Sequence, residues 1–359
     1  MSTFNTKKIT NTSGGAPTFS QGMNVAGADI LSSVGVTEYY SQASAPAGAA
    51  NGAIWYDGTN VYQNTGGTWR ILSVTPPPVW FGERGLFSGG NATNTMDYIT
   101  ISTASNATDF GDLTEAKGYA AACSDNTYGL IGGGLTSIQQ PTVWIDYVTI
   151  ATASNATNFA QLYSSASRWG LASCSDGVYG IFAGGRNFSG YEMNIIDYVT
   201  ISTPANATIF GQLTQANMYT SGCSDGTYGL FDDYNFISYI TIATPGNATF
   251  FGNLTLGRNR MASCSDKTYG LWGGGQSTTD TIDYVTIATP GNATDFGNLT
   301  ALRQDLGACA NGIRGVFGGG QYLSDLDIID YVTIATPGNA TDFGDLTVAR
   351  DGVTSCSGD

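Results

Sequence analysis

Hydrophobic and polar residues alternate in short segments along most of the chain, and turn-forming residues separate these segments. The pattern is clearest in residues 258–299, where four segments have the length and the Val, Ile, Thr and Tyr content of β-strands. They are residues 258–265, 268–275, 283–289 and 294–299. The first two meet at Asp266-Lys267, where two other copies read Asp176-Gly177 and Asp225-Gly226, a dipeptide that favours two-residue hairpins. The pattern predicts four short antiparallel strands.

The same four-segment unit recurs along the chain. A phrase Tyr-Ile/Val-Thr-Ile-Ser/Ala-Thr, followed by Asn-Ala-Thr-x-Phe, occurs six times, and its tyrosines lie 41 to 51 residues apart. The tyrosines are Tyr98, Tyr147, Tyr198, Tyr239, Tyr284 and Tyr331. Repeats of about 40 to 50 residues are typical of propeller blades. Four strands per repeat, arranged around an axis, predict an all-β propeller.

The repeat region begins and ends in the middle of a unit. Residues 84–90 have the pattern of a second strand without a first strand before it, and residues 350–357 have that of a first strand without a second after it. Pairing these two fragments completes one blade and removes open sheet edges. We therefore predict six blades in a ring closed by the N- and C-terminal strands of the repeat region.

Most copies contain Ser-Asp-Gly-Thr-Tyr-Gly-Leu or a variant of it, followed by a glycine pair. The pairs are Gly89-Gly90, Gly133-Gly134, Gly184-Gly185, Gly274-Gly275 and Gly319-Gly320. One copy reads Phe231-Asp232-Asp233 instead, and it belongs to the shortest repeat, so we expect its blade to be trimmed on one face. These features resemble the kelch repeat over residues 80–359. Phenylalanine replaces the usual kelch tryptophan, so the resemblance implies a divergent, kelch-like propeller.

The charge of the chain is carried by the repeat region. Residues 1–79 hold three basic and three acidic residues, whereas residues 80–359 hold the other 10 basic and 25 acidic residues, which give the net charge of −15. Such a surface repels phosphate backbones, so nucleic acid is not an expected partner. No apolar run is long enough to span a bilayer, and no apolar signal region follows the basic N-terminus. We expect no membrane insertion and synthesis in the cytoplasm.

Residues 1–79 do not match the repeat. Residues 75–79 are a proline-rich linker, and residues 1–74 form a separate small, mostly β module, with a meander over residues 51–70 that turns at Asp57-Gly58 and Thr65-Gly66. The Gly-x-x-Trp-Tyr-Asp…Gly-Gly-x-Trp stretch of this meander resembles an element of bacteriophage fibre and tail proteins. The resemblance implies that residues 1–74 attach to other virion proteins, that the chain resides in the virion, and that it is a homotrimer.

The sequence contains no histidine. This excludes a Ser-His-Asp triad, histidine-containing zinc sites and the copper centre of kelch-type oxidases. We expect no catalytic residues, no cofactor and no metal site, although two carboxylates would suffice for a glycosidase and calcium at Asp109, Asp295 or Asp342 stays an alternative.

Six cysteines and six Asn-Ala-Thr sequons occur once per repeat. The cysteines are Cys123, Cys174, Cys223, Cys264, Cys309 and Cys356. Equivalent positions in neighbouring blades lie too far apart for a disulfide, so free, buried thiols are predicted. The asparagines are Asn106, Asn155, Asn206, Asn247, Asn292 and Asn339, and we expect each to cap its own turn rather than to carry a glycan.

Antiparallel strands place the loops after strands one and three on one face, and those after strands two and four on the other. The first set is uniform among the repeats and the second varies. Aromatic residues on the variable loops are candidate receptor contacts, with Arg186 as a polar candidate beside them. The aromatic candidates are Trp144, Tyr191, Tyr234, Phe236 and Tyr322.

Two functions fit these features. In the first, the chain is a bacteriophage tail fibre or fibre-like appendage whose propeller recognises a glycan or protein on the host surface. In the second, it is a capsid, neck or tail decoration protein with a purely structural role. A glycan-processing enzyme or a cellular scaffold is a further alternative.

Overall fold

The computed structural model describes residues 82–359, apart from 92, 164–166 and 277–278, and short segments between residues 24 and 71. The chain divides into two compact units, Met1–Pro78 and Val79–Asp359. Every regular element in the described residues is a β-strand, which confirms the all-β class. None of these residues belongs to a helix that is long and apolar enough to cross a membrane.

The described strands of the first unit form two small sheets. Strand β1 (Asn24–Val25) pairs with β2 (Ala28–Asp29), and the second sheet has the order β3-β4-β5-β6. Its strands are β3 (Tyr39–Ser41), β4 (Ile54–Tyr56), β5 (Val61–Thr65) and β6 (Thr68–Ile71). Strands β4 to β6 are antiparallel neighbours, as in the predicted meander. The predicted turn residues Asp57, Gly58 and Gly66 and the linker 75–79 lie outside the described residues.

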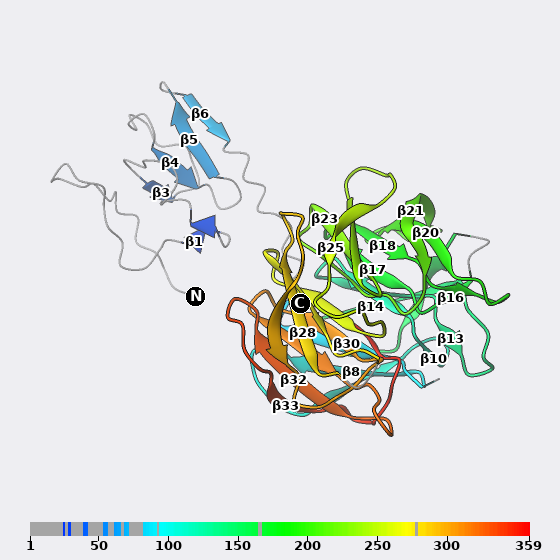
Figure 1. The fold of residues 1–359 in the computed structure, drawn as a ribbon. Helices are drawn as coiled ribbons and strands as arrows, with labels where there is room; N and C mark the ends of the chain where they lie inside the picture. The colour runs from blue at the N-terminus through cyan, green and yellow to red at the C-terminus, as the bar shows by residue number, and fades with distance from the viewer. Residues whose placement is uncertain are drawn as a thin grey trace. The chain divides into compact units, whose positions relative to one another are not determined.

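The second unit is a six-bladed β-propeller of four-stranded antiparallel sheets, as predicted (Figure 1). Blade 1 contains β34 (Thr354–Gly358), β7 (Arg84–Ser88), β8 (Thr95–Thr100) and β9 (Thr108–Asp112). Blade 2 contains β11 (Ala121–Ser124), β12 (Tyr128–Gly132), β14 (Trp144–Thr149) and β15 (Thr157–Gln161). Blade 3 contains β17 (Ala172–Ser175), β18 (Tyr179–Ala183), β20 (Met193–Thr200) and β21 (Thr208–Asn217).

The other three blades follow in chain order. Blade 4 contains β22 (Gly222–Ser224), β23 (Tyr228–Asp233), β24 (Phe236–Thr241) and β25 (Thr249–Asn253). Blade 5 contains β26 (Ala262–Ser265), β27 (Tyr269–Gly273), β28 (Thr281–Thr286) and β29 (Thr294–Asn298). Blade 6 contains β30 (Gly307–Ala310), β31 (Arg314–Gly318), β32 (Ile328–Thr333) and β33 (Thr341–Asp345). Two short ladders pair β10 (Lys117–Gly118) with β13 (Leu135–Thr136), and β16 (Arg168–Trp169) with β19 (Arg186–Asn187).

The ring closes between the two ends of the repeat region. Strand β34 pairs with β7 over five residues, from Thr354 opposite Ser88 to Gly358 opposite Arg84. This confirms the predicted shared blade. Blade 4 is trimmed, also as predicted, because only Tyr234 and Asn235 separate β23 from β24.

Several predicted strand boundaries in residues 258–299 are wrong, and two of them differ most from the structure. The first strand begins at Ala262 rather than at residue 258, because Arg260 has a φ of +63°, which no β-strand accommodates. The third strand covers Thr281–Thr286 and ends before residue 289, where the amide of Thr289 turns back to the carbonyl of Thr286.

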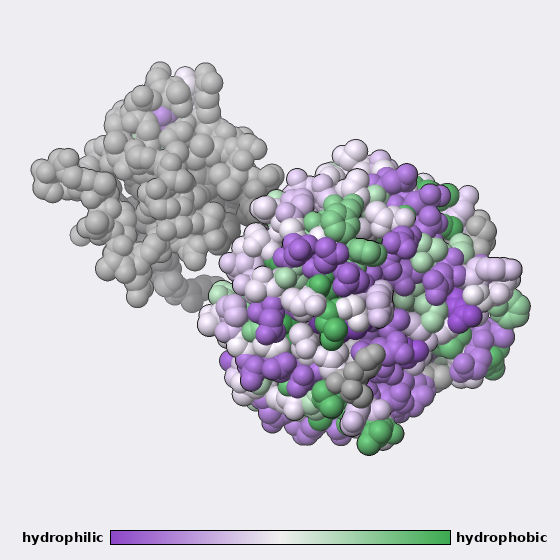
Figure 2. All heavy atoms as spheres, viewed as in Figure 1, coloured by the Kyte–Doolittle hydropathy of each residue, from purple (hydrophilic) through white to green (hydrophobic). Residues whose placement is uncertain are grey.

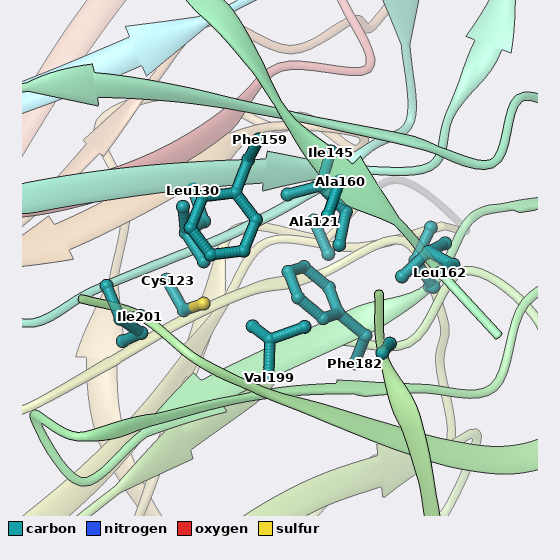
Figure 3. Packing of buried hydrophobic residues seen from close by; sticks show 12 residues of the cluster. Ala121, Cys123, Leu130, Ile145, Phe159, Ala160, Leu162, Phe182, Val199 and Ile201 are labelled. Atoms are coloured by element: carbon teal, nitrogen blue, oxygen red, sulfur yellow. The ribbon is translucent and has the colours of Figure 1, made fainter. Parts of the chain in front are cut away.

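The blades pack through apolar side chains and through the repeated cysteines. In the core between blades 2 and 3, the ring of Phe182 points toward Ala121 and Ile145 of blade 2 (Figure 3). Each cysteine sulfur faces a glycine of the second strand in the next blade, and a Cβ added at that glycine would lie only 2.5–2.9 Å from the sulfur. All six thiols are free and buried, as predicted, and burial raises the pKa of each.

The sequon asparagines join neighbouring blades, so the predicted cap on the local turn is wrong. The Oδ1 of Asn155 accepts a hydrogen bond of 3.0 Å from the amide of Asp112, which belongs to the preceding blade. The other five make the same contact at 3.1–3.2 Å, including Asn106, which bonds the amide of Asp345 across the closure. Six equivalent bonds therefore tie the outer parts of the blades into the ring.

Five blades contain a fully buried ion pair that the sequence analysis did not predict. The aspartate of each third strand pairs with a basic residue six positions before the cysteine, at 2.8–3.3 Å. The pairs are Arg350–Asp97, Lys117–Asp146, Arg168–Asp197, Arg258–Asp283 and Arg303–Asp330. Blade 4 has Asn217 and Ser238 at these two positions, so both charges are absent together.

Blade 4 instead buries a carboxyl without a cation beside it. The Oδ1 of Asp232 accepts bonds from the amide and the hydroxyl of Ser221 at 2.6 and 2.7 Å, while its Oδ2 has no hydrogen-bond partner among the described residues. Burial raises the pKa of Asp232 to about 7, with a smaller opposing effect of the Ser221 bonds.

This raised pKa predicts that Asp232→Asn stabilises the protein at alkaline pH. In the unfolded chain the pKa of this carboxyl is about 3.9. Between about pH 4 and pH 7 the native state therefore binds more protons than the unfolded state, so the stability falls as the pH rises. Asparagine keeps the oxygen that Ser221 bonds and removes the cost of ionisation. We expect a gain of up to about 4 kcal/mol at pH 8 that shrinks toward pH 5. Denaturant unfolding at both pH values checks this, and a less stable variant at pH 8 would contradict it.

Candidate functional site

One face of the propeller is built from nearly identical turns. In five blades, the side chain of the residue directly after the first strand accepts bonds from the amides two and three residues later, at 2.7–3.0 Å. These residues are Asp125, Asp176, Asp225, Asp266 and Asn311. In blade 1, the Oδ1 of Asp359 instead accepts a bond from the amide of Glu83. We call this the uniform face.

The opposite face carries loops that differ in every blade, and we call it the variable face. The predicted aromatic contacts are all exposed there. Trp144 belongs to blade 2, Tyr191 to blade 3, Tyr234 and Phe236 to blade 4, and Tyr322 to blade 6. Four of the five therefore lie on blades 2 to 4. On the part of the surface that Figure 2 shows, apolar side chains form small separate groups among polar ones.

The structure gives two of the predicted residues specific neighbours. The ring of Phe236 packs edge to face against Phe250, with centroids 6.0 Å apart. Arg186 donates from Nε to the carbonyl of Gly190 at 2.9 Å, so it stabilises its own loop. The predicted residues are spread over four blades, with Arg186 and Tyr191 on one loop of blade 3 and two aromatic residues on blade 4.

A second feature of the variable face, which the sequence analysis missed, surrounds the mouth of the central channel. Six equivalent residues, four positions before each cysteine, have φ angles of 55–65°. They are Tyr119, Gly170, Tyr219, Arg260, Asp305 and Gly352. The amide of each donates to the carbonyl of the equivalent residue in the preceding blade at 2.7–3.1 Å, so six bonds form a closed circle. We call this circle the collar.

The left-handed conformation has a structural reason in the collar. It turns the amide and the carbonyl of each residue along the circumference, toward the two neighbouring blades. Glycine adopts this conformation without strain, whereas tyrosine, arginine and aspartate do so at a cost. Only Gly170 and Gly352 are glycines, so four of the six collar positions carry a side chain in spite of that cost.

These side chains and their neighbours form two groups at the mouth. Tyr119, Trp169 and Tyr219 pack edge to face, with centroids 5.2–5.7 Å apart. The guanidinium of Arg260 lies 3.8 Å from the centroid of the Tyr219 ring and 2.6 Å from Oδ2 of Asp305. Polar and aromatic groups are thus held in fixed positions on the collar.

Asp351, which directly precedes Gly352, completes the polar group. The Tyr119 hydroxyl donates to Oδ2 of Asp351 at 2.9 Å. Burial raises the pKa of Asp305 to about 6, opposed by Arg260 and reinforced by Asp351. Burial also raises the pKa of Asp351, and that of Tyr119 rises well above its usual range because the hydroxyl is buried near both carboxylates. One guanidinium therefore faces two buried carboxyls.

The space inside the collar is small. A cavity of about 60 Å³ is lined by the six collar residues and the residue after each, and two cavities of about 100 and 90 Å³ lie between the first strands. Sites that enclose a drug-sized ligand measure about 300–1,000 Å³. The mouth therefore has room for one small group of a ligand, and the rest of the ligand would lie on the variable face.

No group of three Cys, Asp or Glu residues in the described part of the chain is placed to hold a metal ion. The alternative calcium residues, Asp109, Asp295 and Asp342, lie on the outer strands β9, β29 and β33 of three different blades.

A signal for the collar is present in the sequence. The position four residues before the cysteine reads Tyr, Gly, Tyr, Arg, Asp and Gly, although the cysteine itself recurs in all six copies.

A comparison of the chain with models of known protein families finds no match, and a comparison with curated protein sequences finds none either.

Proposed function

We propose that this chain is a bacteriophage virion protein, a tail fibre or fibre-like appendage, whose β-propeller recognises a host surface with its variable face. The resemblance of the Trp55 and Trp69 stretch to fibre and tail proteins supports the virion assignment. The proposal assigns residues 1–74 to attachment and trimerisation.

The difference between the two faces carries the recognition part of the proposal. The uniform face repeats one turn five times, as packing and folding require. The variable face keeps exposed aromatic residues and a collar with strained side chains, neither of which the ring needs. Binding residues typically lie on loops that a rigid scaffold positions.

A trimer would strengthen weak recognition. Linked binding sites raise the effective concentration of the second and third contacts, so avidity exceeds the affinity of one site by large factors. The net charge of −15 also lowers non-specific attraction to other acidic macromolecules.

The test is capture of the labelled full-length chain by a panel of bacterial strains. We expect at least one strain to capture the chain, and a Trp144→Ser/Tyr234→Ser variant to bind at least about tenfold less, since each tenfold loss corresponds to about 1.4 kcal/mol. The matched control is Val178→Ser/Ile313→Ser, which removes two exposed apolar residues from the uniform face and should bind like the wild type. Capture by no strain would favour a decoration protein instead.

A further inference from the structure

Resting on this function, we propose that the collar is a subsite for the uncharged end group of a saccharide. Its ligand would place one sugar residue against Tyr119, Trp169 and Tyr219 and insert a hydroxyl-bearing group into the mouth of the channel. The subsite is separate from the outer aromatic residues and would determine which glycan is accepted.

The first argument is the cost of the collar side chains. A non-glycine residue in the left-handed region carries conformational strain that glycine does not. Gly170 and Gly352 make the same collar bonds as the other four residues, so the circle itself does not need side chains there. Strained residues of this kind concentrate at ligand-binding sites. Tyr219 and Arg260 are therefore better explained by a contact with a ligand than by the fold.

The second argument is the chemistry of the aromatic group. Tyr119, Trp169 and Tyr219 are only partly buried, so each keeps a part of its surface at the mouth. The C–H face of a sugar ring packs on such aromatic surface. The Tyr119 hydroxyl already donates to Asp351, but its oxygen can still accept a bond from the sugar. Aromatic surface beside fixed polar groups matches the two-sided character of a sugar, which has an apolar C–H face and polar hydroxyls.

The third argument is the mixture of donors and acceptors. Arg260 donates hydrogen bonds, whereas Asp305 and Asp351 accept them, and the contacts of Arg260 with Asp305 and of Tyr119 with Asp351 hold these groups in place. A sugar hydroxyl both donates and accepts, so it can bridge a carboxylate and a guanidinium. A ligand with only donors or only acceptors could bond only one of these two kinds of group at the mouth.

The negative charge of the collar and of the repeat region favours neutral saccharides over acidic ones. Two buried carboxyls at the collar face one guanidinium, and the repeat region carries the whole net charge of −15. A uronic acid, a sialic acid or a phosphorylated sugar would be repelled on approach. The volume of about 60 Å³ further limits the inserted part to a small substituent, so the collar accepts an end group rather than the middle of a chain.

The test uses the full-length chain and the variant Arg260→Gly/Asp305→Gly. Glycine is compatible with the collar at both positions, so the variant should unfold at the same temperature as the wild type or above it, while it loses the polar group. The probes are an array of neutral hexose and N-acetylhexosamine oligosaccharides and a matched set that contains uronic acids or phosphate. The control is Val178→Ser/Ile313→Ser on the uniform face.

We expect the wild type and the control to bind one or more neutral probes, and the collar variant to bind them at least about tenfold less. Binding of acidic probes only, binding of no probe, or equal binding by the collar variant would overturn the proposal.

A second measurement distinguishes a failure of the saccharide subsite from a failure of host recognition. Bacteria that capture the chain are treated either with periodate, which cleaves vicinal diols of sugars, or with protease. Loss of capture after periodate alone supports the saccharide subsite. Loss after protease alone overturns the subsite but leaves host recognition in place, whereas capture by no strain overturns host recognition itself.

Discussion

Deletion of residues 350–359 is expected to destroy the cooperative fold of the whole propeller. The deletion removes β34, which forms all five residue pairs with β7 across the closure, and leaves Asp97 buried without Arg350. Loss of one partner of a buried ion pair alone costs about 3–5 kcal/mol, against a total stability of about 5–15 kcal/mol for a typical protein. The edge of β7 that β34 no longer covers would also promote aggregation. Thermal unfolding and size-exclusion chromatography measure both effects.

Two further variants separate the causes of this loss. Deletion of Asp359 alone should cost little, because that residue is exposed and contributes one backbone and one side-chain bond. Arg350→Ala in the full-length chain should show the cost of the ion pair without loss of the strand. A chain that lacks residues 350–359 and still unfolds cooperatively at the wild-type temperature would contradict closure by β34.

Arg258→Asn should destabilise the protein by about 3–5 kcal/mol, because it leaves Asp283 uncompensated in a fully buried site. The substitution also removes donors to the carbonyls of Gly274 and Trp272. Such a loss lowers the unfolding temperature by about 10 °C in a protein of this size. Denaturant unfolding gives the free energy directly.

Blade 4 supplies the matched control for this prediction. The double variant Arg258→Asn/Asp283→Ser installs in blade 5 the pair that blade 4 has at Asn217 and Ser238. We expect it to be more stable than Arg258→Asn alone, with a coupling between the two sites of about 0.5–3 kcal/mol. Additive costs of the two substitutions would show that the absence of both charges in blade 4 has no energetic basis.

The blades and the closure follow from local signals in the sequence. Tyr98 and its five counterparts mark the third strands, and Asp176-Gly177 marks a hairpin turn by its own side-chain chemistry. The unmatched fragments at residues 84–90 and 350–357 then leave one way to complete the last blade. These features need no knowledge of which blade lies beside which.

The features that were missed depend on contacts between distant residues. Asn155 was expected to cap its own turn, but it bonds Asp112 of the neighbouring blade. The ion pair of Arg258 with Asp283 joins residues that are 25 positions apart in the sequence, and no local pattern predicts it. The conformation of Tyr119 results from bonds to two other blades, so propensity alone would have placed this tyrosine in a strand.

The predicted contact residues identified a face but not its centre. Aromatic residues on variable loops, such as Trp144 and Tyr234, are visible in the sequence because the repeat stops there. The collar lies beside the repeated cysteines, where the pattern suggests only structure. Its side chains stand out once the left-handed backbone and the closed circle of bonds are known.

The most direct test of recognition by the variable face is hydroxyl-radical footprinting of the full-length chain, free and bound to cells of a strain that captures it. We predict that oxidation of Trp144, Trp169 and Tyr219 falls on binding. Oxidation of Tyr128 and Tyr179, beside the turns of the uniform face, should stay unchanged. Protection of Tyr128 and Tyr179 with no change at the three variable-face residues would contradict it.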